Sequence, residues 1–168
     1  MDDHDAIRRV VADAFGSDAE ADLVDRIRAS DEYEPSMDLV ALVDGQGIVG
    51  HAMISRATLT SDAERSIAML SPLAVAPAMH GRGIGGALVR AVIAIADSRE
   101  EPLVVLEGSP AYYPRFGFEP AARHGITLPL PDWAPPEAAH VMLLTAYDAS
   151  EGDLRGTVRY PAAFDGLD

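Results

Sequence analysis

The stretch from Pro72 to Arg90, PLAVAPAMHGRGIGGALVR, decides how the middle of this chain folds. A short apolar run ends at Pro77, and an amphipathic segment follows after a glycine-rich loop. The loop contains four glycines: Gly81, Gly83, Gly85 and Gly86. Glycines let backbone N–H groups crowd around an anion, and a helix start adds unpaired donors and a positive dipole end. The stretch therefore predicts a strand, a phosphate-binding loop and a helix in succession.

The length and composition of the chain favour one folded domain. The chain has 168 residues and 48% hydrophobic residues, which is enough for a substantial core. We expect residues 1–168 to form a single domain, with the tail 150–168 packed on it. There are no cysteines, which excludes disulfides, thiolate nucleophiles and cysteine-based zinc sites.

The charge of the chain is strongly acidic. Asp and Glu total 27 against 13 Lys and Arg, a net charge of −14. Nucleic acid and anionic membranes are therefore poor partners. Two interpretations of the charge stay open: a solvated surface that maintains solubility, or attraction for a cationic, amine-bearing substrate. The acidic start, MDDHD, lacks the basic region of a secretory signal, and no uncharged apolar run reaches the roughly 18 residues of a membrane span, so we expect a cytoplasmic protein.

Hydrophobic spacing along the chain predicts a mixed α/β fold. Helices are expected over residues 5–15, from Ser17 or Asp18 to Ala29, and over 83–98, with a short one over 111–116. Strands are expected over 38–43, 48–57, 66–76, 102–106 and 140–147, with a hairpin turn at 44–47 and a proline-rich loop at 129–136. This order predicts a mixed, mostly antiparallel central sheet with flanking helices.

Two familiar phosphate sites fit the glycine loop poorly. A Walker A loop ends in Gly-Lys-Ser/Thr, whereas Ala87 follows the last glycine here. The loop does match the dinucleotide motif G-x-G-x-x-G literally, and Glu107 follows at about the distance expected of the ribose-binding acid. However, residues 76–80 separate the glycines from the strand, and too little chain follows Glu107 for a second nucleotide-binding half.

A third kind of site fits better. The order of strand, Val75-Ala76-Pro77, glycine loop and helix resembles the acyl-CoA site of the GNAT superfamily of N-acetyltransferases. The family's loop reads Gln/Arg-x-x-Gly-x-Gly/Ala. Its x-x-Gly-x-Gly part corresponds to residues 81–85, and His80 stands at the Gln/Arg position. A second block, YYPRFGF at residues 112–118, resembles the Tyr-x-x-x-Gly-Phe segment of the family.

Further matches narrow the resemblance to the YhbS-like N-acetyltransferases and extend it over nearly the whole chain. They lie at Val49–His51, Leu70–Val75, Pro110–Phe118 and Val158–Phe164. The resemblance implies a GNAT-like acyltransferase fold. It also shows one departure: the family usually begins with a strand before the first helix, and this N-terminal edge strand is missing here.

The resemblance implies acetyl-CoA as co-substrate and no metal. The pyrophosphate would be held by the amides of the glycine loop. The pantetheine arm would pair with the open edge of residues 73–75, where a backbone N–H would face the thioester oxygen. Arg82 either contacts a phosphate or faces solvent. The implied binding residues are Leu73, Ala74, Val75, His80, Gly81, Arg82, Gly83, Gly85 and Gly86.

The resemblance also implies catalytic roles. Tyr113 lies at the general-acid position, where it would protonate the leaving thiolate, with Tyr112 adjacent and a buried aromatic as the structural alternative. Many family members carry the base on the strand before the loop, but residues 66–76 contain no acid. The candidate bases are Glu107 and His51; alternatively, the amine arrives neutral and loses its proton to water.

The expected function is N-acyl transfer from acetyl-CoA to a primary amine by direct attack in a ternary complex. The acceptor would be a small molecule or peptide, favoured if cationic, and a homodimer is compatible with the family. A non-catalytic acyl-CoA-binding or regulatory domain is the first alternative, because the strand lacks a carboxylate. An NAD(P)-binding protein is the second.

Overall fold

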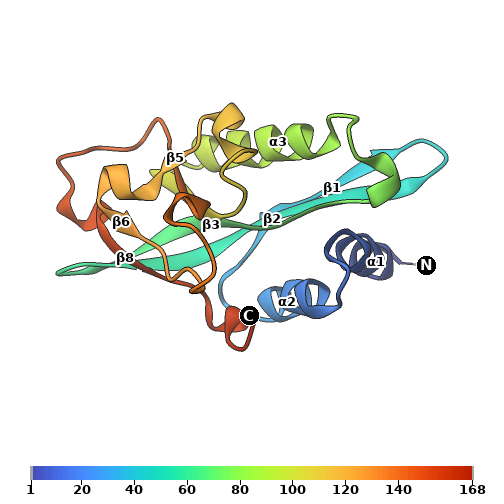
Figure 1. The fold of residues 1–168 in the computed structure, drawn as a ribbon, viewed down its shortest axis with the longest axis horizontal. Coiled ribbons are helices and arrows are strands. Elements are labelled where there is room, and N and C mark those ends of the chain that lie inside the picture. The colour runs from blue at the N-terminus through green and yellow to red at the C-terminus, as the bar shows by residue number, and fades with distance from the viewer. Residues whose placement is uncertain (1, 168) are drawn as a thin grey trace.

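The computed structural model describes residues 2–167 (Figure 1). The helices are α1 (Asp3–Phe15), α2 (Ala19–Arg28) and α3 (Ile84–Ser98). The strands are β1 (Tyr33–Val43), β2 (Gly47–Thr60), β3 (Glu64–Val75), β4 (Leu103–Glu107), β5 (Glu119–Pro120), β6 (Ile126–Thr127), β7 (Ala139–Leu143) and β8 (Gly156–Arg159). Short 3-10 helices are η1 (Pro77–Met79), η2 (Tyr113–Phe116), η3 (Ala121–His124), η4 (Pro136–Ala138), η5 (Gly152–Leu154) and η6 (Ala162–Phe164).

The strands form one sheet in the order β5-β7-β4-β3-β2-β8-β6, and β1 also pairs with β2. The long β2 pairs with β1 along its first part and with β8 through Thr58–Thr60. Of the strand pairs described, only β3–β4 and β6–β8 are parallel. The sheet is therefore mixed and mostly antiparallel, which confirms the fold class expected from the sequence.

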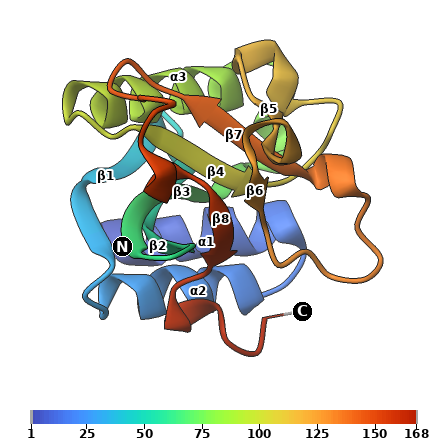
Figure 2. The ribbon, with the colours of Figure 1, turned by 90° about the vertical axis from the view of Figure 1, so that its left-hand side faces the viewer.

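Helices cover both faces of this sheet (Figures 1 and 2). On one face, α3 buries Leu88, Val89 and Val92 in a cluster that includes Ile54 and Leu106 of the sheet. The apolar stripe predicted over residues 83–98 is thus the packing face of α3, and each such side chain contributes about 1.5–3 kcal/mol when buried. Gly50 permits this contact, because a Cβ there would lie 2.9 Å from Leu88.

The opposite face is covered by α1 and α2. Their buried side chains, among them Val11, Leu23 and Ile27, form a second cluster with Met53 and Ala74 of the sheet. Local signals explain where α1 begins and ends: the Asp2 carboxylate accepts a hydrogen bond from Asp5 N (2.9 Å), and Gly16 ends the helix at φ +69°. Of the described elements α1 is the first, so no strand precedes the helices within residues 2–167.

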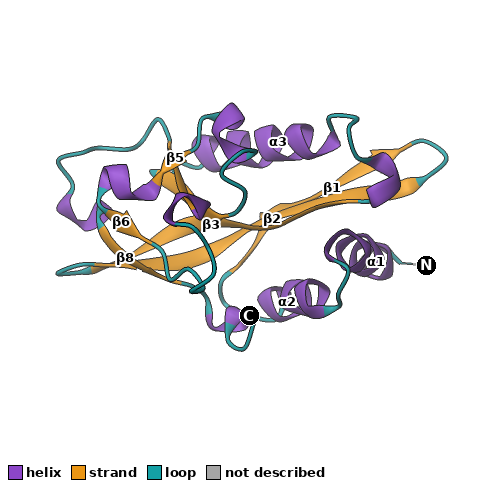
Figure 3. Cartoon of the chain, viewed as in Figure 1, coloured by secondary structure: helices purple, strands orange, loops and turns teal. Residues whose placement is uncertain are grey.

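The C-terminal third differs from the sequence prediction in detail (Figure 3). The strand expected over 140–147 is shorter, and β8 was missed. Gly156 begins β8 at φ +124°, and a Cβ there would lie 2.1 Å from the carbonyl oxygen of Thr60. Only glycine therefore lets this segment reach β2. Tyr160 and Phe164 pack against a third core cluster, which includes Val105.

Candidate active site

A cleft opens where β3 and β4 diverge. The two strands pair only at Ala68–Val104 and Met69–Val105. Beyond this point β3 contains an irregularity, because Leu70 to Leu73 lie opposite the shorter segment Ile54 to Ala52 of β2. The cleft has a volume of about 770 Å³. Its lining includes residues of α3, which covers one face of the sheet, and Ala14 and Phe15 of α1, which covers the other face (Figure 1).

The edge of β3 presents backbone groups to this cleft. Ala76 N donates to Val49 O (2.8 Å), so alternate residues of β3, including Ala74, direct their backbone groups at β2. The backbone groups of Leu73 and Val75 consequently point away from β2, toward the cleft. His80 occupies one of them, because its Nε2 donates to Val75 O (2.9 Å). The imidazole thus ties the glycine loop to the end of β3.

The four glycines serve two different purposes. Gly81 and Gly83 have φ of +77° and +79°, which other residues rarely adopt, and a Cβ on either would meet nothing within 4 Å. They shape a turn that is open on the cleft side, directly before the first N–H groups of α3. Gly85 and Gly86 instead allow η2 to approach α3, since a Cβ there would lie 2.7 Å from the Tyr112 hydroxyl and 3.3 Å from Phe116.

Two arginines at the rim were not predicted from the sequence. The Arg90 guanidinium lies 5.2 Å from the Phe116 ring centroid, and that of Arg115 lies 4.7 Å from the Tyr112 ring centroid. Both arginines line the cleft. In the sequence, the only indication of a role for them was their position beside the glycine loop (Arg90) or inside the YYPRFGF segment (Arg115). The predicted Arg82 is exposed and is not among the cleft-lining residues.

Tyr113 lies at the bottom of the cleft on the α3 face. Its ring packs edge-on against Phe118 and tilted against His140, at centroid distances of 5.8 and 5.5 Å. A Cβ on Gly108 would lie 2.4 Å from this ring, so the glycine makes room for it. Burial, with a smaller effect of Tyr112, raises the pKa of Tyr113 to about 12. Tyr113 is therefore a protonated phenol at neutral pH.

Glu107 ends β4 and lines the cleft. Side chains alternate along a strand, so Glu107 lies on the same face as Val105, away from α3. Its Oε2 accepts a hydrogen bond from the Tyr160 hydroxyl (2.8 Å). Among the described residues that line the cleft, Glu107 is the only acid.

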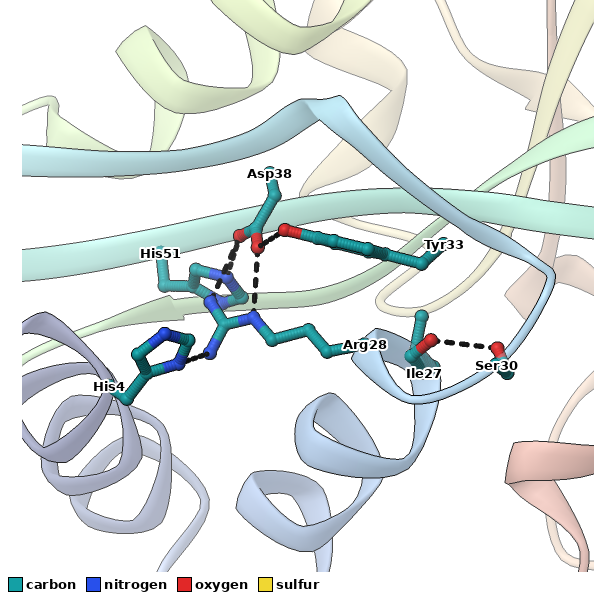
Figure 4. A network of polar contacts seen from close by, with 7 residues as sticks. All are labelled: His4, Ile27, Arg28, Ser30, Tyr33, Asp38 and His51. Carbon is teal, nitrogen blue, oxygen red and sulfur yellow. Dashed lines mark hydrogen bonds and ion pairs between the residues drawn. The ribbon is translucent and has the colours of Figure 1, made fainter.

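His51 lies elsewhere, in a buried network under α1 and α2 (Figure 4). Its Nε2 lies 2.7 Å from Asp38 Oδ1, and the other carboxylate oxygen accepts from Arg28 (3.0 Å) and Tyr33 (2.7 Å). Burial alone would raise the pKa of Asp38, but the hydrogen bonds from His51, Arg28 and Tyr33 outweigh it and hold that pKa well below its ordinary value. His51 is not among the cleft-lining residues, so the structure separates the two candidate bases.

Comparisons with known proteins agree with this architecture. A family model described as Acetyltransferase (GNAT) domain matches residues 1–121. The chain belongs to the GNAT family. It is similar to the uncharacterised N-acetyltransferase YjhQ of Escherichia coli K12, with 35% identity over 155 residues that cover 91% of this chain and 84% of YjhQ. This membership sets aside the NAD(P)-binding alternative.

Two solved GNAT structures share the fold over nearly the full length. The E. coli protein YhbS in complex with CoA is 30% identical, with a TM-score of 0.86, and the match covers 99% of this chain and 88% of YhbS. A GNAT acetyltransferase from Brucella melitensis in complex with acetyl-CoA is 31% identical, with a TM-score of 0.75 and coverages of 97% and 92%.

Residues 2–167 contain no group of three or more His, Asp and Glu side chains placed to hold a metal ion. In the same part of the chain, no helix combines the length and the apolar character needed to cross a membrane.

Proposed function

We propose that this GNAT protein transfers the acetyl group of acetyl-CoA to a primary amine by direct attack in a ternary complex. The observation that carries the proposal is the cleft itself, which joins an open glycine loop at a helix start to a phenol and a carboxylate. The GNAT relatives in complex with CoA and acetyl-CoA support acetyl-CoA as the donor.

The donor would bind along the α3 side of the cleft. Amides of residues 81–86 at the start of α3 suit the pyrophosphate, because a helix start offers unpaired donors and a positive dipole end. Arg90 and Arg115 add positive charge at the rim. The cleft-facing backbone groups of Leu73 and the N–H of Val75 suit the amides of the pantetheine arm and the thioester oxygen, since His80 bonds the Val75 carbonyl.

The chemical step needs two proton transfers. The amine nitrogen attacks the thioester carbon, the C–S bond breaks, and the acetyl group ends on nitrogen. The attacking nitrogen gives a proton to Glu107, and Tyr113 gives its phenolic proton to the departing sulfur. Glu107 would act as the base because it lines the cleft, whereas His51 is buried in the network with Asp38.

The acceptor would enter from the face that carries α1. Phe15 offers an apolar surface there, and Glu107 offers a negative charge in a cleft wall otherwise free of acids among the described residues. Together with the net charge of −14, this favours a cationic primary amine. Glu107 also weakens the case for a non-catalytic CoA-binding domain, which rested on the absence of a carboxylate from β3.

A screen of amines tests the proposal. Purified protein is incubated with acetyl-CoA and polyamines, aminoglycosides, amino acids or peptide N-termini, and the release of CoA thiol is followed. We expect release above the amine-free rate with at least one cationic amine. Tight CoA binding by calorimetry with no turnover on any amine would favour the non-catalytic alternative.

Three expectations stay predictions with their own tests. Cell fractionation tests the cytoplasmic location. Light scattering tests the homodimer. Coincident thermal unfolding by two spectroscopic probes tests whether residues 1–168 form a single domain.

A further inference from the structure

Tyr160 links the C-terminal tail to the cleft. Its hydroxyl donates to Glu107 Oε2 at 2.8 Å, across 53 residues of sequence. We propose that Tyr160 is a positioning residue, which orients the Glu107 carboxylate for accepting the proton of the amine. The inference rests on the proposed function and adds to it a role for the Val158–Phe164 block.

The tail around Tyr160 is held in place from several sides. The preceding β8 pairs with Thr58–Thr60 of β2. The Phe164 ring packs against that of Tyr160 at a centroid distance of 5.5 Å. Arg26 of α2 donates through Nε to Ala163 O (2.9 Å). A phenol anchored in this way has one fixed direction in which to donate its hydrogen bond.

The pairing has a defined protonation state. Burial, followed by the hydrogen bond to Glu107, raises the pKa of Tyr160 far above its ordinary value of 10. Tyr160 is therefore always a donor near neutral pH, and the carboxylate is its acceptor. Among residues 2–167, Tyr160 is the only side chain that hydrogen-bonds the Glu107 carboxylate, so the other oxygen, Oε1, is free to accept a proton from the amine.

The other titratable groups of the cleft come from different elements. The loop after β3 contributes His80, α3 contributes Arg90, and η2 with its flanks contributes Tyr112, Tyr113 and Arg115. The lining residues from α1, Ala14 and Phe15, carry no charge. On the neighbouring β7, the His140 ring packs with Tyr113 on the opposite face from Glu107. Among the described residues, none of these groups hydrogen-bonds the Glu107 carboxylate, so loss of the Tyr160 hydroxyl would remove its side-chain donor.

The first arm of the test needs no turnover. The 13C NMR signal of the Glu107 carboxyl is recorded at neutral pH in protein with labelled glutamate, and it is assigned with Glu107→Gln. In Tyr160→Phe this signal should shift and broaden, because the carboxylate loses its hydrogen-bond donor and its fixed orientation. Tyr147→Phe is the matched control: Tyr147 packs against the same core cluster but does not line the cleft, and its loss of a hydroxyl should leave this signal unchanged.

The second arm separates kcat from KM. In Tyr160→Phe, kcat should fall several-fold while the KM for acetyl-CoA stays within about twofold, because Tyr160 acts on the carboxylate and not on the donor. In a Glu107→Gln background, Tyr160→Phe should cause no further loss of kcat, because the two side chains act as one unit.

Two results would overturn the proposal: an unchanged Glu107 carboxyl signal in Tyr160→Phe, or a changed signal without a loss of kcat. A merely structural tyrosine would lower thermal stability and leave both the signal and kcat in place. If the wild type acetylates no amine, the proposed function fails, and the NMR arm alone decides whether Tyr160 orients the Glu107 carboxylate.

Discussion

On the α3 side of the cleft, the edge of β3 and the glycine loop come from Pro72 to Arg90, residues that follow one another along the chain. The opposite side instead brings together Phe15 and Glu107, with Tyr160 bonded to Glu107, from three distant segments. The first side presents backbone amides and glycines, which suit a phosphate chain that is the same for every reaction. The second side presents side chains, which set the chemistry and the choice of amine. The two sides should therefore respond differently to mutation, one in donor affinity and the other in rate.

The largest difference between the effects on rate and on donor affinity is expected at Tyr113, which lies on the α3 side but takes part in the chemical step. Tyr113→Phe should lower kcat by about 100-fold or more, because the leaving sulfur loses its proton donor, while the Kd for CoA stays within about twofold. Thiol release and calorimetry measure the two quantities. Tyr112→Phe is the matched control, since the Tyr112 hydroxyl lies beside Gly85 at the helix start. A larger loss of kcat in Tyr112→Phe than in Tyr113→Phe would instead assign the general acid to Tyr112.

The second prediction concerns Asp38, which stabilises the fold and does not line the cleft. Asp38→Asn should lower the free energy of unfolding by about 3 kcal/mol, because it leaves Arg28 without its carboxylate in a buried network. Glu64→Gln, which breaks the exposed Arg159–Glu64 pair, should cost at most about 0.5 kcal/mol. Denaturant unfolding measures both. Folded Asp38→Asn protein should keep its affinity for CoA; a large loss of affinity would place the network in the site.

The same network predicts a pH dependence of stability. The pKa of Asp38 is lowered in the folded state, so its contribution is complete above its ordinary value of 3.8 and is lost as the pH falls below that value. Asp38→Asn should remove this part of the acid dependence. Unfolding curves between about pH 2.5 and 6 check the sign, and parallel curves for the two proteins would contradict it.

A substitution in the glycine loop should have a smaller effect, which is confined to the binding of CoA. Gly83→Ala should raise the Kd for CoA by about 5–30-fold, because a left-handed backbone costs a non-glycine residue about 1–2 kcal/mol. Gly45→Ala imposes the same kind of strain at φ +80° in the β1–β2 turn, away from the cleft-lining residues. It should cost stability without changing the Kd. Equal Kd values for the two variants would argue against a phosphate cradle at Gly83.

The smallest effect is expected at the rim. Arg90→Gln should weaken CoA binding by about two- to fivefold at low salt and by less at high salt, since exposed charges are screened. Calorimetry at two ionic strengths measures this. A wild-type Kd for CoA that does not change with salt would contradict a contribution of Arg90 to CoA binding.

The contrast between the two sides also explains what could be predicted from the sequence. Residues 72–90 form a local motif, so the strand, loop and helix could be identified from spacing alone. The Tyr160–Glu107 contact joins segments 53 residues apart, and the short β8 that carries Tyr160 exists because it pairs with β2. No local pattern encodes such pairings. His51 was a plausible base by residue type, and only the fold reveals its buried partner Asp38.

The central claim is direct transfer across the cleft, and a single-turnover experiment tests it most directly. Protein in excess over acetyl-CoA is mixed with the best amine of the screen, and mass spectrometry follows the amine and the intact protein. The account predicts one acetylated amine for each CoA thiol released and no acetylated protein when the amine is omitted. Acetyl groups on the protein before the amine is added, or thiol released without acetylated amine, would contradict it.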